Sequence, residues 1–241
     1  MTPSLPRLAQ RLLGLAAGRC PACGLGESPE LCADCARELA PRTGGYCPRC
    51  GALVPDADAP ARLCGDCRVV PRPWDAFAFH GEYAGLLRLL ILRYKFQGGL
   101  GLGRLLEGFM ADALQRHLGD KPAPELITPV PLHASRLRGR GYNQSLELCR
   151  ALAKRRHIPI ELQALRRTRA TQQQYRLNIR QRRENIKGAF AADPSLVGGR
   201  RALLVDDVMT SGATLEECAR ALRRAGAAWV GVLVLARTAE G

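Results

Sequence analysis

Near the end of the chain, the pattern of hydrophobic and polar positions is typical first of a strand, then of a helix, and then of a second strand. The apolar runs 202–205 and 229–236 are typical of strands buried in a sheet. Between them, apolar residues recur with a helical period from Glu216 to Gly226, and arginines gather near its end, where cations suit the helix dipole. This order predicts a strand–helix–strand unit.

The middle of the chain carries further alternating and periodic tracts. The alternating run 74–80 and the apolar run 125–130 predict strands, while the tracts 83–96 and 100–118 predict helices separated by a Gly-Gly break. Another helix is expected to follow an Arg- and Gly-rich loop and to run to about Arg156. The mixture of strands and helices predicts an α/β fold class.

Composition argues against a membrane-spanning protein. The chain has 241 residues, enough for one or two domains, and 46% of them are hydrophobic, which is ample for a core. No apolar run approaches the ~20 residues that span a bilayer, so we expect no membrane insertion. The segment 5–17 is weakly amphipathic, and its arginines make it a poor secretory signal. We therefore predict that residues 1–19 form a short helical segment.

Eight of the ten cysteines lie before residue 68 in four Cys-x-x-Cys knuckles. They are Cys20 and Cys23, Cys32 and Cys35, Cys47 and Cys50, and Cys64 and Cys67. Two knuckles supply the four thiolates of a structural zinc site, so a double zinc ribbon with two zinc ions is predicted over residues 20–70. Sequential and crossed pairings of the knuckles are both possible. A disulfide scaffold or a redox pair is less favoured, because we expect no secretory signal and no knuckle opens a strand–helix unit.

Two adjacent carboxylates, Asp206 and Asp207, follow the apolar run 202–205, and a small-residue turn comes after them. The turn 210–214 offers backbone N–H groups, hydroxyls and a helix N-terminus, all of which favour a phosphate. A carboxylate before such a turn can accept hydrogen bonds from ribose hydroxyls. The same acid pair could be a helix cap only, since Asp and Thr-x-Gly are common in caps and turns.

Positive charge is unevenly distributed along a chain whose formal net charge is +14. Residues 136–187 contain fifteen Lys or Arg and three Glu, a local balance of +12. Arg138 and Arg140 lie in a loop between a predicted strand and a predicted helix, which is a plausible second anion site. The basic tract 166–187 could form a lid, a nucleic-acid surface or only solvated helix faces.

Several motifs carry a resemblance to known families. Residues 202–214 resemble the 13-residue signature of type I phosphoribosyltransferases. The tracts Pro129–Leu132, Arg140–Gln144 and Thr171–Phe190 add a resemblance to the bacterial competence protein F family, which includes gluconate-utilisation-type proteins. The cysteine knuckles look like the zinc finger of that family, so the resemblance covers nearly the whole chain.

The resemblance implies a doubly wound parallel sheet over residues 74–241, a cytoplasmic location and a role in competence or DNA utilisation. The expected ligand is 5-phosphoribosyl-1-pyrophosphate (PRPP) with Mg²⁺. The oxygens of PRPP itself would hold most of the metal's coordination sites. Asp206 and Asp207 would bind the ribose and act as the catalytic residues, and Arg138 and Arg140 would bind the pyrophosphate. The phosphate would lie on Thr210, Ser211, Gly212, Ala213 and Thr214.

Two classes of function remain open at this point. The first is a phosphoribosyltransferase, a glycosyltransferase-class enzyme with an unknown acceptor. The second is a non-catalytic protein that retains the fold, binds single-stranded DNA and works with other DNA-uptake proteins; a PRPP-sensing regulator is a weaker third. Fold alone does not decide among them.

Overall fold

The structure is a computed structural model that describes residues 19–25, 29–97, 100–131, 144–169, 171 and 179–239. Except for Arg19, the predicted N-terminal helix of residues 1–19 lies outside the described residues, as do Arg138 and Arg140. Among the described helices, none is long and apolar enough to cross a membrane.

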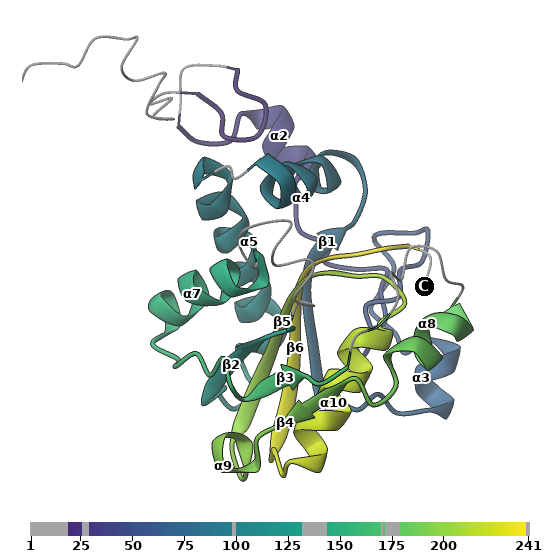
Figure 1. Cartoon of the computed structure of the whole chain (residues 1–241). Coiled ribbons are helices and arrows are strands. Elements are labelled where there is room, and N and C mark those ends of the chain that lie inside the picture. The colour runs from purple at the N-terminus through teal and green to yellow at the C-terminus, as the bar shows by residue number, and fades with distance from the viewer. Residues whose placement is uncertain are drawn as a thin grey trace, which may run out of the picture.

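The centre of the fold is a four-stranded parallel sheet in the order β1-β6-β5-β2 (Figure 1). Its strands are β1 (Ala76–Glu82), β2 (Leu126–Pro129), β5 (Arg201–Met209) and β6 (Trp229–Arg237). All four were expected from the hydrophobic pattern. One detail of the expectation is wrong, because β5 does not end at the acid pair. It continues to Met209, since β6 goes on pairing with it (Asp206 opposite Val234 and Val208 opposite Ala236).

Helices cover both faces of this sheet, so the predicted doubly wound α/β architecture is confirmed. They are α4 (Gly85–Gln97), α5 (Leu100–Leu118), α7 (Gln144–Arg156) and α10 (Ala213–Arg224). Alternate residues of β5 serve the two faces. Leu203 and Val205 belong to the core with α4, α5 and α7, whereas Ala202 and Leu204 belong to the core with α10.

A smaller layer lies beside α10 and was only partly expected. It contains the antiparallel pair β3 (Leu165–Arg167) and β4 (Phe190–Ala192), together with α8 (Ile179–Ile186) and α9 (Pro194–Val197). Helix α8 confirms part of the helix predicted in the basic tract. The two strands were not predicted, because runs of three residues carry no readable alternation.

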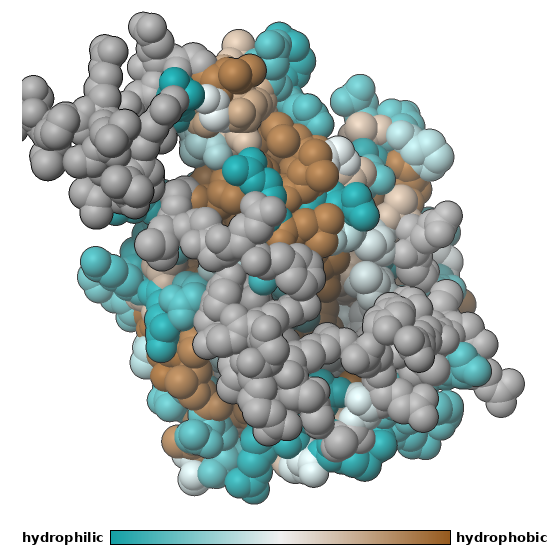
Figure 2. Space-filling view, turned by 45° about the horizontal axis from the view of Figure 1, so that its top comes forward, coloured by the Kyte–Doolittle hydropathy of each residue, from teal (hydrophilic) through white to brown (hydrophobic). Residues whose placement is uncertain are grey.

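The cysteine-rich front end packs directly on the sheet layers, and it contributes α2 (Ala33–Glu38) and α3 (Gly65–Val69). Cys20 and Cys35 share a core with α4, while Cys47, Cys50 and Cys67 share the other core with β1 and α10. Figure 2 turns the top of Figure 1 forward and shows apolar residues gathered in the upper middle of that face, with hydrophilic residues among and beside them. The boundaries 20–70 and 74–241 stay a prediction.

Candidate functional site

The acid pair lies at the carboxyl end of β5, where one neighbouring strand has already ended. Strand β2 pairs with β5 only as far as Val205, whose carbonyl accepts a hydrogen bond from the Val130 N–H at 2.9 Å. Beyond that point β5 pairs with β6 alone among the described strands, and Asp206 and Asp207 are both partly buried. Ligands of open α/β sheets bind at such carboxyl ends.

Asp206 is held by two donors and is hard to ionise. Its Oδ1 accepts hydrogen bonds from Ser145 Oγ and from the Asp207 backbone N–H, both at 2.9 Å. Burial, followed by the negative charge of Asp207, raises the pKa of the Asp206 carboxyl from 3.8 to about 7. The two carboxylates therefore form a site that gains from a cation or from hydroxyl donors.

Asp207 already has a cationic neighbour that the sequence did not reveal. Lys95 Nζ, near the end of α4, lies 2.8 Å from Asp207 Oδ2, and both side chains are largely buried, at 15% and 13% exposure. The positive charge of Lys95 also acts on Asp206, where it opposes the rise in pKa. Lys95 and Ser145 are thus site residues that sequence reasoning missed, since each comes from a helix far from residue 206 in the chain.

The turn after β5 has the backbone geometry of an anion cradle. Gly212 is the N-cap of α10 and adopts φ 78°, a left-handed conformation that favours glycine. Glycine has no side chain to accept hydrogen bonds from the first-turn N–H groups of α10, so a phosphate oxygen can take that role.

The five predicted phosphate residues share this turn but differ in exposure. Thr210 is exposed and Thr214 is half-buried, whereas Ser211 and Ala213 are 8% and 3% exposed. Ala213 can therefore contribute its backbone N–H and little else. Val208 and Met209, the last residues of β5, separate the acid pair from the turn, and the roles of the turn residues stay predictions.

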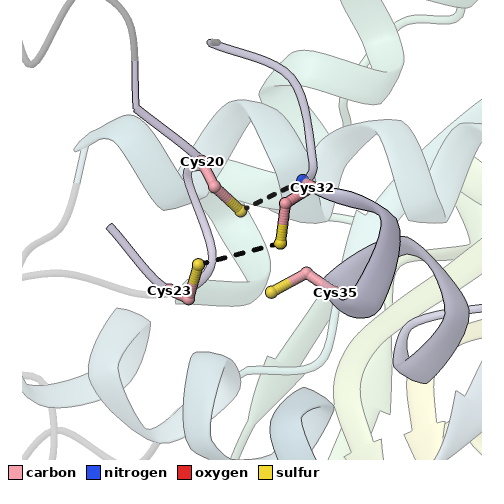
Figure 3. Close-up of side chains that lie close together, drawn as sticks. All are labelled: Cys20, Cys23, Cys32 and Cys35. Atoms are coloured by element: carbon pink, nitrogen blue, oxygen red, sulfur yellow. Dashed lines mark hydrogen bonds between the residues drawn. The ribbon is translucent and has the colours of Figure 1, made fainter. Parts of the chain in front are cut away.

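The eight knuckle cysteines form two tetrads by sequential pairing, which resolves the choice that the sequence left open. The tetrads are Cys20, Cys23, Cys32 and Cys35, and Cys47, Cys50, Cys64 and Cys67. Within each tetrad the sulfur atoms all lie within 4.8 Å of one another. Figure 3 shows the four sulfur atoms of the first tetrad turned toward a common centre.

The sulfur spacing fits zinc better than disulfides. The Sγ atoms of Cys23 and Cys32 are 3.9 Å apart, and those of Cys50 and Cys64 are 3.7 Å apart. A Zn–S bond of about 2.3 Å places the sulfurs of a tetrahedral site about 3.8 Å apart, whereas a disulfide needs about 2.05 Å. Four cysteines close each tetrad, so zinc held there would have no open position and would be structural.

Two domain families match this chain. The double zinc ribbon domain matches residues 14–68, and the phosphoribosyl transferase domain matches residues 143–241. The first match covers both tetrads, and the second covers the acid pair and the turn that follows it.

Curated relatives match most of the chain. It is 39% identical over 214 residues to the DNA utilization protein YhgH of Escherichia coli O157:H7, covering 86% of this chain and 90% of that one. It is 36% identical over 213 residues to the competence protein F of Haemophilus influenzae, with the same coverage. It is also 27% identical to the competence protein ComFC of Bacillus subtilis, covering 83% and 80% of the two chains.

Solved structures with partial similarity include the allosteric regulatory enzyme of purine biosynthesis and the purine phosphoribosyltransferase of Pyrococcus horikoshii. The first has a TM-score of 0.40 and 20% identity, covering 60% of this chain and 30% of that chain. The second has a TM-score of 0.33 and 15% identity, covering 59% and 86%.

Proposed function

The chain belongs to the family of competence protein F and the DNA utilization protein YhgH, and from this premise we propose that it binds PRPP with Mg²⁺ and transfers its phosphoribosyl group. The acceptor is a nucleophile still to be identified. The proposal places the reaction at the carboxyl end of β5, with Asp206, Asp207 and the turn 210–214 as the binding residues.

One observation carries the proposal: two partly buried carboxylates lie near the carboxyl end of β5, and a glycine-capped helix N-terminus follows the end of that strand. Ribose offers two adjacent hydroxyl donors, and its 5′-phosphate offers an anion. The acid pair and the turn, which are separated by Val208 and Met209, supply the complementary acceptor and donor groups. The raised pKa of Asp206 further supports a ligand that brings positive charge or hydroxyl donors.

Asp206 and Asp207 are the two carboxylates at this end of β5. Two carboxylates are too few to enclose Mg²⁺, so these residues fit a metal held mainly by the oxygens of the substrate better than a protein cage. Bound Mg²⁺ would neutralise the pyrophosphate leaving group. In the transfer, the C1–O bond to pyrophosphate breaks and its electron pair leaves with the pyrophosphate, while a lone pair of the acceptor forms the new bond to C1. The carboxylates of Asp206 and Asp207 would stabilise the positive charge that develops on the ribose ring.

Calorimetric titration with PRPP and Mg²⁺ tests the binding step. Replacing Asp206→Asn and Asp207→Asn together should weaken binding about 100-fold or more, since hydrogen bonds to charged groups contribute about 1.5–3 kcal/mol each. Asp193→Asn is the matched control, because Asp193 only caps α9, where asparagine caps equally well. Absence of PRPP binding by the unaltered protein, or full binding by the double variant, would contradict the proposal. Pyrophosphate release over a panel of bases and amines then tests transfer.

Single-stranded DNA binding is the second candidate, and the relatives' names together with a basic surface support it. The last turn of α7 presents Lys154, Arg155 and Arg156, all exposed. If these residues contact phosphates, affinity for an oligonucleotide should fall steeply with salt. Replacing Lys154→Glu and Arg155→Glu should weaken binding and flatten the salt dependence while leaving PRPP binding unchanged. Salt-independent binding, or none, would remove this candidate.

A further inference from the structure

We propose that Arg237 is a positioning residue that couples the second cysteine tetrad to the phosphate turn 210–214. Metal in the tetrad and phosphate on the turn would then stabilise each other. The nature of the ligand rests on the proposed function, but the coupling itself is argued from contacts within the protein. The second tetrad means Cys47, Cys50, Cys64 and Cys67 throughout.

Arg237 is the last residue of β6 and is only 4% exposed. Its Nε donates to the Cys50 carbonyl at 3.3 Å, and its Nη1 donates to the carbonyls of Met209 at 3.4 Å and of Thr210. A planar guanidinium offers five donors in a fixed fork. One rigid group therefore contacts both the tetrad and the start of the turn.

The contact with Thr210 sets the direction of the next amide. A trans peptide unit is planar, so the Thr210 carbonyl and the Ser211 N–H point in opposite directions. Because Arg237 holds that carbonyl, the Ser211 N–H is directed away from Arg237. Loss of Arg237 would free this peptide plane to rotate and would remove one pre-oriented donor from the turn.

A second arginine links the same tetrad to the other side of the turn. Arg72 Nε donates to Cys67 Sγ at 3.4 Å, and its Nη1 forms an ion pair with Glu216 in the first turn of α10. The side chains of Arg72 and Glu216 are 15% and 7% exposed. The turn is thus anchored to the tetrad before residue 211 and after residue 215.

Charge explains why arginines lie at this interface. Four thiolates around Zn²⁺ carry a net charge of −2, and a buried guanidinium needs nearby negative charge. No carboxylate pairs with Arg237 among the ion pairs of the described residues. Its hydrogen bonds run to carbonyls and to a threonine hydroxyl. The metal-loaded tetrad, with its net negative charge, therefore supplies the counter-charge that Arg237 lacks, and loss of the metal would loosen Arg237 and weaken the contact between Arg72 and Cys67.

Coupling of this kind is reciprocal. If metal in the second tetrad strengthens phosphate binding on the turn, phosphate on the turn must slow loss of that metal by the same equilibrium factor. Typical couplings between sites are about 5–150-fold.

The experiment uses the full zinc-loaded chain and compares Arg237→Ala and Arg237→Lys with Arg200→Ala. Arg200 is a matched control, because it also donates to backbone carbonyls, of Leu196 and Glu125, but at the amino end of β5. Hydrogen exchange of the amides in 210–214 is measured without ligand. We expect exchange about tenfold faster in Arg237→Ala, a smaller increase in Arg237→Lys and no local change in Arg200→Ala. Unchanged exchange in a folded Arg237 variant would overturn the coupling.

A second measurement follows alkylation of the second-tetrad cysteines by N-ethylmaleimide, read by peptide mass spectrometry. Bound PRPP with Mg²⁺ should slow this alkylation about tenfold in the unaltered protein and in Arg200→Ala, and by a clearly smaller factor in Arg237→Ala, where only the link through Arg72 is left. Failure of PRPP to bind would refute the proposed function, and the exchange measurement would still decide the coupling. Bound PRPP that leaves alkylation unchanged would refute the coupling while the proposed function stands.

Discussion

The substitution Asp206→Asn should make the protein more stable while it weakens PRPP binding. The pKa of the Asp206 carboxyl is raised from 3.8 to about 7, chiefly by burial. One pKa unit corresponds to about 1.36 kcal/mol, so the ionised carboxyl costs on the order of 4 kcal/mol of unfolding free energy. Asparagine carries no charge and keeps an oxygen that can accept from Ser145 and from the Asp207 N–H. Allowing for its unmatched amide donors, we expect a gain of about 2–3 kcal/mol at pH 8.

The pH dependence separates this cause from a general packing effect. Above pH 7 the folded protein holds Asp206 ionised, and the cost is fully present. As the pH falls from 7 toward 3.8, the folded state takes up the proton before the unfolded state does, and the cost disappears. Urea unfolding at several pH values should therefore show the advantage of Asp206→Asn shrinking steadily between pH 7 and pH 4. If the gain in unfolding free energy is constant over this range, or if the variant is less stable at pH 8, the claim that ionised Asp206 destabilises the folded protein is refuted.

Three further predictions concern neighbouring residues. The substitution Lys95→Met removes the cation that favours the ionised acid pair, so the pH at which PRPP binding is half-maximal should move upward. Titration calorimetry from pH 6 to 9 would show this shift, and an unchanged midpoint would count against the ion pair. Gly212→Ala forces a side chain into φ 78°, where its Cβ would lie 2.5 Å from a methionine methyl, so urea unfolding should show a loss of about 1–2 kcal/mol. Burial lowers the pKa of His80 and His117 to about 4. As the pH falls from 6.5 to 4, the unfolded chain therefore binds protons before the folded protein does, and the free energy of unfolding should decrease. The measurement uses the Asp206→Asn background, because the Asp206 carboxyl has the opposite pH dependence.

Long, strongly patterned segments were predictable from the sequence. The run 202–205 identified β5, and the periodic tract after it identified α10, because burial on one or both faces leaves a plain hydrophobic signature. The end of β5 was not predictable. Asp206 and Asp207 are polar, and they continue the strand only because β6 supplies pairing partners beyond Val205.

The knuckle spacing predicted two four-thiolate sites but could not choose the pairing. Each Cys-x-x-Cys knuckle is chemically equivalent, so only the path of the chain between Cys35 and Cys47 decides which knuckles meet. The roles of Lys95 and Ser145 could not be predicted from the sequence for a related reason. Each reaches the acid pair from a helix packed on the same face, and no local pattern marks such a long-range meeting.

The ring of Phe77 lies so close to Gly51 that a Cβ at that glycine would be 2.4 Å from it, and Trp74 Nε1 donates to the Arg49 carbonyl at 2.6 Å. Chimeras that exchange the cysteine-rich front end between relatives will therefore need to keep Gly51 together with Phe77, and to keep a backbone path that brings the carbonyl of residue 49 to Trp74. A C-terminal half expressed alone would present bare aromatic rings to water and should precipitate.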